Sequence, residues 1–184
     1  SFTSFSATNS AAVALGLRTD GAADNADNST DDKTVTITGS LTLAEHDAGQ
    51  VSDGYTFPTD FEVPFYAFKL SPAGEDSTIT SIVFALSGVN GVTTTNFANA
   101  QLYRDINNNA SYDSGTDVAI GGSGAVILSG QTGTVTFSSS WNATTSENYL
   151  LIMDTLDIRP GDMTTVSLPT SNITGTGDLT TGSV

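Results

Sequence analysis

The chain has 184 residues and a formal net charge of -15, with 5 Lys+Arg, 20 Asp+Glu, one His and no Cys. This length suits one domain that buries its core without disulfides. The charge excludes electrostatic binding to nucleic acid and argues against docking on anionic lipid, and the lack of Cys excludes thiol catalysis and thiolate metal sites. Because no apolar stretch reaches the length of a transmembrane helix, we expect no membrane insertion.

The composition favours strands over helices. The chain holds 29 Thr, 22 Ser, 18 Gly and 16 Asp, but only 2 Lys and 4 Glu. Thr favours strands, Gly and Asp favour turns, and good helix formers are scarce. We therefore predict an all-β protein. A Ser/Thr/Gly/Asp-rich surface with few lysines is also typical of secreted and cell-surface proteins, so we expect an extracellular location and a mature chain without a leader.

The first 32 residues are predicted to form an arm separate from a β-sandwich domain at 33–184. Val13, Leu15 and Leu17 alternate with Ala12, Ala14 and Gly16. This period of two predicts a strand at 11–17 with one bulky and one slim face; a helix is the rival interpretation. Residues 20–32 (DGAADNADNSTDD) contain five Asp and no apolar side chain larger than Ala, which predicts a solvated linker.

Short strands follow the linker. The segment 33–43 places alternate apolar residues on one face, and in 77–86 Ile82, Phe84 and Leu86 are predicted to be buried. In 61–70 the apolar phase shifts by one residue beside Pro64, which indicates a β-bulge. Turn signals separate the strands, so the pattern predicts a two-sheet Greek-key or Ig-like sandwich with an N-terminal strand arm. Further strands are predicted at 98–104, 118–121, 125–128, 133–138, 148–155, 164–168 and 171–175.

The sharpest motif is LYRDINNNASYDSGTDVAIG at 102–121. Its oxygen-bearing side chains alternate as in the first part of an EF-hand loop, which wraps a hard cation. Position 6 is Ala110 rather than Gly, and position 12 is Thr116 rather than Glu. We expect calcium (Ca²⁺) here, with a metal-free loop held by its own Asx turns as the alternative. The candidate ligands are Asp105, Asn107, Asn109, Ser111 (through its carbonyl), Asp113 and Asp117.

A family resemblance appears in this motif and in the strands around it, which read PFYAFKLSPAGEDSTITSIVFALSG, GTVTFSS and NYLLIMDTLDIRPGDMTTVSL. The segment from about 41 to 177 resembles extracellular β-sandwich modules of large bacterial and archaeal surface proteins, in which a loop of the form LYxDxNxNxxxDxGxDxxxG recurs. The resemblance implies a calcium loop and a surface setting. It implies no activity, because such modules serve as stalks, surface-layer parts and fibre subunits.

The sequence gives weaker support to other candidate sites. His46, between Glu45 and Asp47, is expected to be a surface residue in a turn, because no nucleophile or further ligand lies near it in the sequence. A glycosidase that pairs one of the four Glu residues (Glu45, Glu62, Glu75 or Glu147) with an Asp is conceivable, but short strands offer little cleft. A carbohydrate-binding module would need an aromatic platform. The candidates for one are Trp141, which we expect at a strand edge, and Tyr55, Tyr66 and Tyr112.

The expected function follows from the N-terminal arm. A lone strand on a polar linker must bury Val13, Leu15 and Leu17 either in its own sandwich or in a neighbouring copy by β-strand addition. Donation to a neighbour joins identical subunits into an open filament. We therefore expect a non-enzymatic structural subunit of an extracellular filament or surface layer, a homopolymer stabilised by calcium. The alternative is a carbohydrate-binding or adhesion module of a larger surface protein.

Overall fold

The structure is a computed structural model that describes residues 6–8, 14–16, 39–53, 58–176 and 178–180. The chain divides into two compact units, Ser1–Thr38 and Gly39–Val184. In the first unit, β1 (Ser6–Thr8) pairs antiparallel with β2 (Ala14–Gly16), which sets Leu15 opposite Ala7. A strand is thus present at 14–16, within the predicted 11–17, but the expectation of a lone strand was wrong, because β1 pairs with it. Val13, Leu17 and the linker 20–32 lie outside the described residues.

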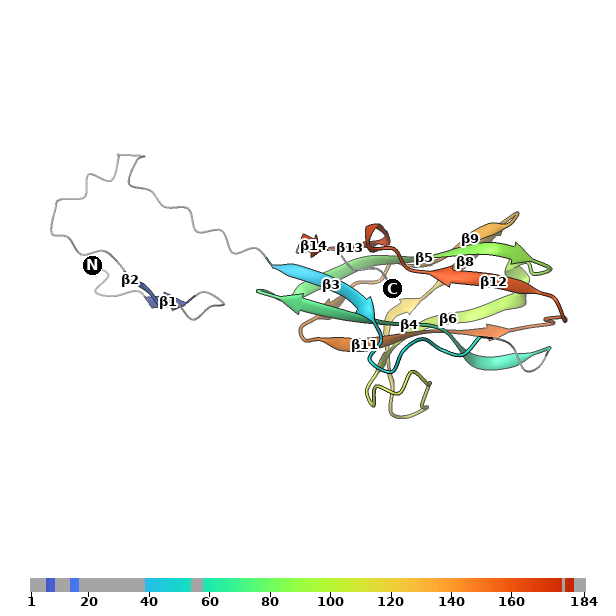
Figure 1. Ribbon diagram of the computed structural model, residues 1–184, viewed down its shortest axis with the longest axis horizontal. Helices are drawn as coiled ribbons and strands as arrows, with labels where there is room; N and C mark the ends of the chain where they lie inside the picture. The colour runs from blue at the N-terminus through green and yellow to red at the C-terminus, as the bar shows by residue number, and fades with distance from the viewer. Residues whose placement is uncertain (1–5, 9–13, 17–38, 54–57, 177, 181–184) are drawn as a thin grey trace. The chain divides into compact units, whose positions relative to one another are not determined.

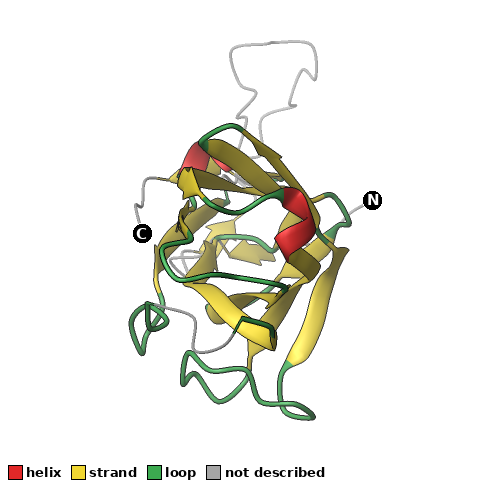
Figure 2. Cartoon of the chain, turned by 90° about the vertical axis from the view of Figure 1, so that its right-hand side faces the viewer, coloured by secondary structure: helices red, strands yellow, loops and turns green. Residues whose placement is uncertain are grey.

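The second unit is an all-β sandwich, as predicted, with two sheets packed face to face (Figures 1 and 2). The first sheet has the strand order β14-β3-β4-β11-β6-β7. These strands are β3 (Ser40–Glu45), β4 (Asp60–Ala73), β6 (Phe97–Asp105), β7 (Val118–Ser123), β11 (Glu147–Thr155) and β14 (Asp178–Thr180).

The second sheet is built around the long strand β5 (Ser77–Asn90), which has four partner strands in the described residues. On one edge β5 pairs with β10 and β9, and β9 continues to β8; β12 and β13 also pair with β5. These strands are β8 (Ala125–Ser129), β9 (Thr132–Phe137), β10 (Trp141–Ala143), β12 (Met163–Ser167) and β13 (Ile173–Gly175). The three-residue strands β10 and β14 were not predicted, because so short a segment shows no measurable alternation.

The predicted bulge lies in β4. Its register against β11 pairs Leu151 with Tyr66 but the next residue, Ile152, with Pro64, so one residue of β4 is skipped. The bulge lets Phe65 join the same interior cluster as Tyr66, since an extra residue rotates the strand locally. The phase shift in the sequence and the register shift in the sheet are therefore one feature.

The main core lies between the two sheets. Phe68, Phe84 and Phe137 are fully buried there, and Phe84 contacts the other two rings edge-on at centroid distances of 5.7 and 6.2 Å. The predicted burial of Ile82, Phe84 and Leu86 is confirmed, with exposures of 0–2%. Trp141 lies on the edge strand β10, as expected, but its ring is buried in this core.

The strand β11 is buried on both faces. Its inward residues join the main core, while Leu150 and Ile152 form a second cluster with Ala67 on the outer side of the first sheet. Side chains from the segment 46–53 and from the loop after β6 pack onto this second cluster, namely Val51, Ala110 and Tyr112, together with Tyr103 of β6. Two loops thus cover the outer face of the first sheet, and they carry the candidate site.

Helical structure in the described residues is limited to two 3₁₀ turns, Thr94–Asn96 and Thr170–Asn172. Neither approaches the roughly 20 residues that a helix needs to cross a bilayer, and no helix of the described chain qualifies as a span.

Candidate functional site

The loop between β6 and β7 is closed at its base by Asp117. Its Oδ1 accepts the N–H of Ile106 at 3.1 Å, and its Oδ2 accepts the N–H of Asp113 at 2.8 Å. The N–H of Asp117 itself donates to the Asp113 carbonyl at 3.0 Å. The carboxylate of Asp117 therefore holds the two ends of the loop together through backbone amides.

Three of the candidate ligands meet at one point. The amide nitrogens of Asn107 and Asn109 both donate to Oδ2 of Asp113, each at 2.8 Å. These two hydrogen bonds lower the pKa of Asp113 below its ordinary value. The N–H of Ser111 donates to Oδ1 of Asn109 at 2.8 Å, which makes an Asx turn. Asn107, Asn109 and Asp113 are thus brought together as the spacing predicts.

The turn at Ala110 has the backbone conformation that the motif requires. Ala110 has φ of +57°, in the left-handed region, at the loop position where an EF-hand carries Gly. An L-residue pays a cost of about 1–2 kcal/mol for this conformation. The N–H of Ala110 donates to Oδ2 of Asp105 at 2.8 Å, which holds the turn in place.

Asp105, the first residue of the loop motif, faces inward. Only 2% of it is exposed, and its carboxylate accepts three N–H donors. Asn108 N–H donates to Oδ1 at 2.7 Å, while Ala110 N–H and Nε2–H of His46 donate to Oδ2 at 2.8 and 2.9 Å. Because a buried carboxyl group is stable only when it is hydrogen-bonded, these three donors account for the burial of Asp105.

The expectation that His46 is a surface residue was wrong. His46 is 3% exposed, and its side chain lies against Asp105, which is 59 residues away in sequence. Nδ1 accepts the Ala48 N–H at 3.0 Å, so in the neutral ring the proton is on Nε2, where it is donated to Asp105. Both ring nitrogens are engaged inside the protein. This His–Asp pair therefore fastens the segment 46–53 to the loop and has no nitrogen available to a substrate.

A row of polar groups continues the contact between the two loops. The Asn148 amide donates to Oδ1 of Asn108 at 2.6 Å and to Oδ2 of Asp47 at 2.9 Å, and Lys69 pairs with Asp47 at 2.8 Å. We call His46, Asp47, Lys69, Asp105, Asn108 and Asn148 the polar cluster. The residues of β4, β11 and β6 within it are neighbours in register, since Asn148 pairs with Lys69 on one side and Asp105 on the other.

Acid should weaken one part of this cluster. The hydrogen bond from Lys69, followed by that from Asn148, lowers the pKa of Asp47. A lowered folded-state pKa contributes stability above the unfolded value of about 3.9 and loses it as the pH falls through the folded value. We expect Asp47→Asn to be slightly less stable than the wild type at pH 7 and to converge with it below pH 4. Thermal melts between pH 7 and pH 2 measure this. Asp76→Asn, in the exposed turn after β4, is the control, and parallel Asp47→Asn and wild-type curves would contradict the expectation.

The aromatic candidates do not form an exposed platform in the described residues. Tyr66 and Trp141 are 6% and 9% exposed, and Tyr55 lies outside the described residues. The ring of Tyr112 packs on Tyr103 with centroids 4.6 Å apart. The hydrogen bond between these two hydroxyls and partial burial raise the pKa of Tyr103 to about 12. Tyr112 thus packs the loop against the sheet and does not belong to an exposed platform.

The acidic residues do not gather into a metal centre of the usual kind. Among the described residues, no three His, Asp or Glu side chains are placed to share one ion. Glu147 is engaged by Arg104, at 3.1 Å, and by the Tyr149 hydroxyl, at 3.0 Å. The oxygen set of the loop therefore combines one outward carboxylate, Asp113, with the amides of Asn107 and Asn109, while Asp105 and Asp117 face backbone N–H groups.

Comparisons with family models, with curated proteins and with solved structures returned no match.

Proposed function

We propose that this chain is a secreted structural subunit of an extracellular filament or surface layer, assembled by donation of its N-terminal strand. The observation that carries the proposal is the organisation of the chain into two units, with a strand at Ala14–Gly16 in the first and a sandwich in the second. The bulky face of that strand needs an apolar partner, and a 13-residue acidic linker suits a subunit that reaches across to a neighbour.

The polar cluster, in which His46, Asp105 and Asn148 are buried, supports a structural rather than a catalytic role. The one histidine of the chain uses both nitrogens internally, and Asp105 is saturated with N–H donors. Buried hydrogen-bonded networks of this kind order loops and specify one packing. Rigid, well-covered subunits suit a polymer that transmits load, so the cluster serves the proposed assembly without any reaction.

Calcium is the second part of the proposal. The side-chain amides of Asn107 and Asn109 meet the Asp113 carboxylate at one point through their nitrogens, and the left-handed turn at Ala110 matches the position that is Gly in an EF-hand. Rotation of the two amides by half a turn presents their oxygens in place of the nitrogens, which is what a cation beside Asp113 requires. A bound Ca²⁺ supplies positive charge to a strongly acidic protein.

Deletion of residues 1–17 tests the assembly. We expect the shortened chain to keep a cooperative thermal transition and a β-type circular dichroism spectrum, because the core lies within Gly39–Val184. It should form no filaments in negative-stain electron micrographs under conditions in which the full chain does. Filaments of normal appearance from the shortened chain would reject strand donation.

Chelation tests the calcium site. We expect EDTA to lower the melting temperature of the wild type and to leave that of Asp113→Ala unchanged, since Asp113 carries the outward carboxylate of the loop. Asp113 is a better probe than Asp105, whose removal damages the fold directly. Asp76→Ala should keep the wild-type response. A wild-type melting temperature that does not respond to EDTA or added Ca²⁺ would show that the Asx turns suffice.

A further inference from the structure

The outer face of the second sheet is formed by uncharged residues. They stand in three rows across β12, β5, β9 and β8, because every second residue of a strand lies on the same face. The residues between them on the same strands, such as Phe84, Val135 and Leu128, pack into or against the main core. All outward residues are exposed or half-buried. The rows, which we call the neutral face, are Thr165, Ser87, Thr132 and Ser129; Ser167, Ala85, Thr134 and Ile127; and Val83, Thr136 and Ala125.

The lack of charge on this face results from the way the sheet is assembled. The chain has a net charge of -15, and 14% of its residues are charged. The neutral face is nevertheless drawn from three separate segments, 83–87, 125–136 and 165–167. The segment 118–146, which supplies β8 and β9, contains no Asp, Glu, Lys or Arg at all. Strand pairing therefore brings distant neutral segments together on one side of an acidic protein.

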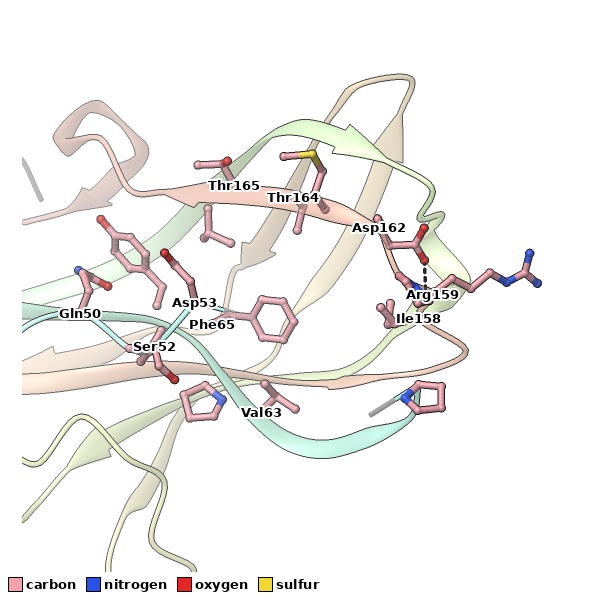
Figure 3. A pocket seen from close by; sticks show the side chains of 18 residues that line it. Gln50, Ser52, Asp53, Val63, Phe65, Ile158, Arg159, Asp162, Thr164 and Thr165 are labelled. Atoms are coloured by element: carbon pink, nitrogen blue, oxygen red, sulfur yellow. Dashed lines mark hydrogen bonds between the residues drawn. The ribbon is translucent and has the colours of Figure 1, made fainter. Parts of the chain in front are cut away.

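The two sheets differ in how their outer faces are covered. On the first sheet, two loops pack over the second buried cluster and carry charged groups such as Asp47 and Asp105. In the part of the chain that the structure describes, no such cluster lies on the outer side of the second sheet. A groove of about 920 Å³ lies between β12 and β4, so the neutral face ends at β12, which Thr165 marks in Figure 3.

Charge indicates which partner the neutral face fits. Two copies of a chain with a net charge of -15 repel each other, and the repulsion is smallest where neither facing surface carries a carboxylate. A face without charges needs no opposite charge on its partner, so the same face of another copy is complementary to it. Sheets packed face to face interleave their side chains at a spacing of about 10 Å. Ile127, which is 61% exposed, supplies the largest apolar contact of the face.

The size of the neutral face determines how strong such a contact is. Strands lie about 4.8 Å apart and alternate residues about 6.7 Å apart, which gives the three rows an area of about 350 Å². A stable interface between free proteins buries about 800 Å² on each partner. The neutral face is therefore too small to hold two free molecules together. It becomes effective when many copies are already linked, because their contacts then act together.

We propose that the neutral face is a lateral contact, through which filaments of this chain pack side by side with the same face of copies in a neighbouring filament. The inference rests on the proposed function and adds a contact between filaments to the contact along them. Salt should strengthen this packing, because ions at about 0.15 M limit the repulsion between the acidic surfaces around the contact to a range of about 8 Å.

Charged replacements of Thr134 in the full-length chain test the contact. Thr134 lies on the inner strand β9, between Ala85 and Ile127 in its row, and its side chain points away from the core. Filaments of the wild type, Thr134→Glu and Thr134→Lys are compared by negative-stain electron microscopy, which measures the fraction of filament length that lies side by side. Ser123→Glu and Ser123→Lys are the matched controls, because Ser123 is exposed on β7 of the first sheet. Melting temperatures check that each variant folds.

We expect each Thr134 variant to lower the side-by-side fraction about tenfold or more, because like charges then meet in a contact that excludes water. The Ser123 variants should pack as the wild type does. A mixture of Thr134→Glu and Thr134→Lys filaments should pack again, since opposite charges meet across the contact.

Three results would overturn the inference and leave the proposed function intact. They are wild-type filaments that stay single, Thr134→Glu filaments that pack as the wild type does, and mixed filaments that do not pack again. A wild-type chain that forms no filaments would overturn both the proposed function and the inference that rests on it.

Discussion

Replacement of Asp105 by Ala should destabilise the sandwich by about 3–5 kcal/mol, because it removes one partner of a buried charged network. The change leaves Nε2–H of His46 and the N–H groups of Asn108 and Ala110 without their acceptor. A buried unsatisfied donor costs about 1–3 kcal/mol, and such costs are not fully additive within one network. Urea unfolding followed by Trp141 fluorescence measures the effect.

Asp113→Ala is the matched control for this prediction. Asp113 belongs to the same loop and also accepts two side-chain donors, but those donors, Asn107 and Asn109, are exposed and turn to water when it is removed. We therefore expect a much smaller loss of stability than for Asp105→Ala when calcium is absent. Equal losses for the two variants would contradict the distinction between an inward structural carboxylate and an outward one.

Assembly should depend on one face of the N-terminal strand. Val13→Asp or Leu15→Asp is expected to raise the protein concentration needed for polymerisation about a hundredfold or more, while Ala12→Ser should change it little. Burial of one Val or Leu side chain contributes about 1.5–3 kcal/mol, and 1.4 kcal/mol corresponds to a factor of ten. A charged Asp in an apolar groove adds a desolvation cost.

Light scattering at a series of concentrations, together with negative-stain microscopy, gives the comparison. Each of these variants keeps the sandwich sequence unchanged, so their melting temperatures should equal that of the wild type and serve as the control for folding. Equal effects of Leu15→Asp and Ala12→Ser would show that the two faces are equivalent, which strand donation into an apolar groove does not allow.

Features that depend on neighbouring residues could be predicted from the sequence. Alternation placed Ile82, Phe84 and Leu86 in the core, and the phase shift beside Pro64 located the bulge of β4. The strand predicted at 148–155 corresponds to β11. These predictions succeed because residues i and i+2 of a strand lie on the same face, so the alternation of apolar residues shows which face is buried.

Asn107, Asn109 and Asp113, which the spacing predicts to lie close together, are in contact in the loop, because contacts within a short loop follow from its spacing. It failed for His46, whose partner Asp105 lies on another strand. No local pattern distinguishes a His in a turn that faces water from one that is buried against a sheet. Whether the His is buried depends on which strands pair and on their register.

The sequence by itself therefore determined the β class, the acidic surface, the bulge and the Asp/Asn loop. Only the tertiary structure decided that this loop and the segment 46–53 cover the outer face of the first sheet and join through His46, Asp105 and Asn148. Only it placed residues of β4 and β12 along one groove. The physical reason is that side-chain alternation is a local property, whereas the order of strands in a sheet is set by contacts between distant segments, which depend on the packing of the whole chain.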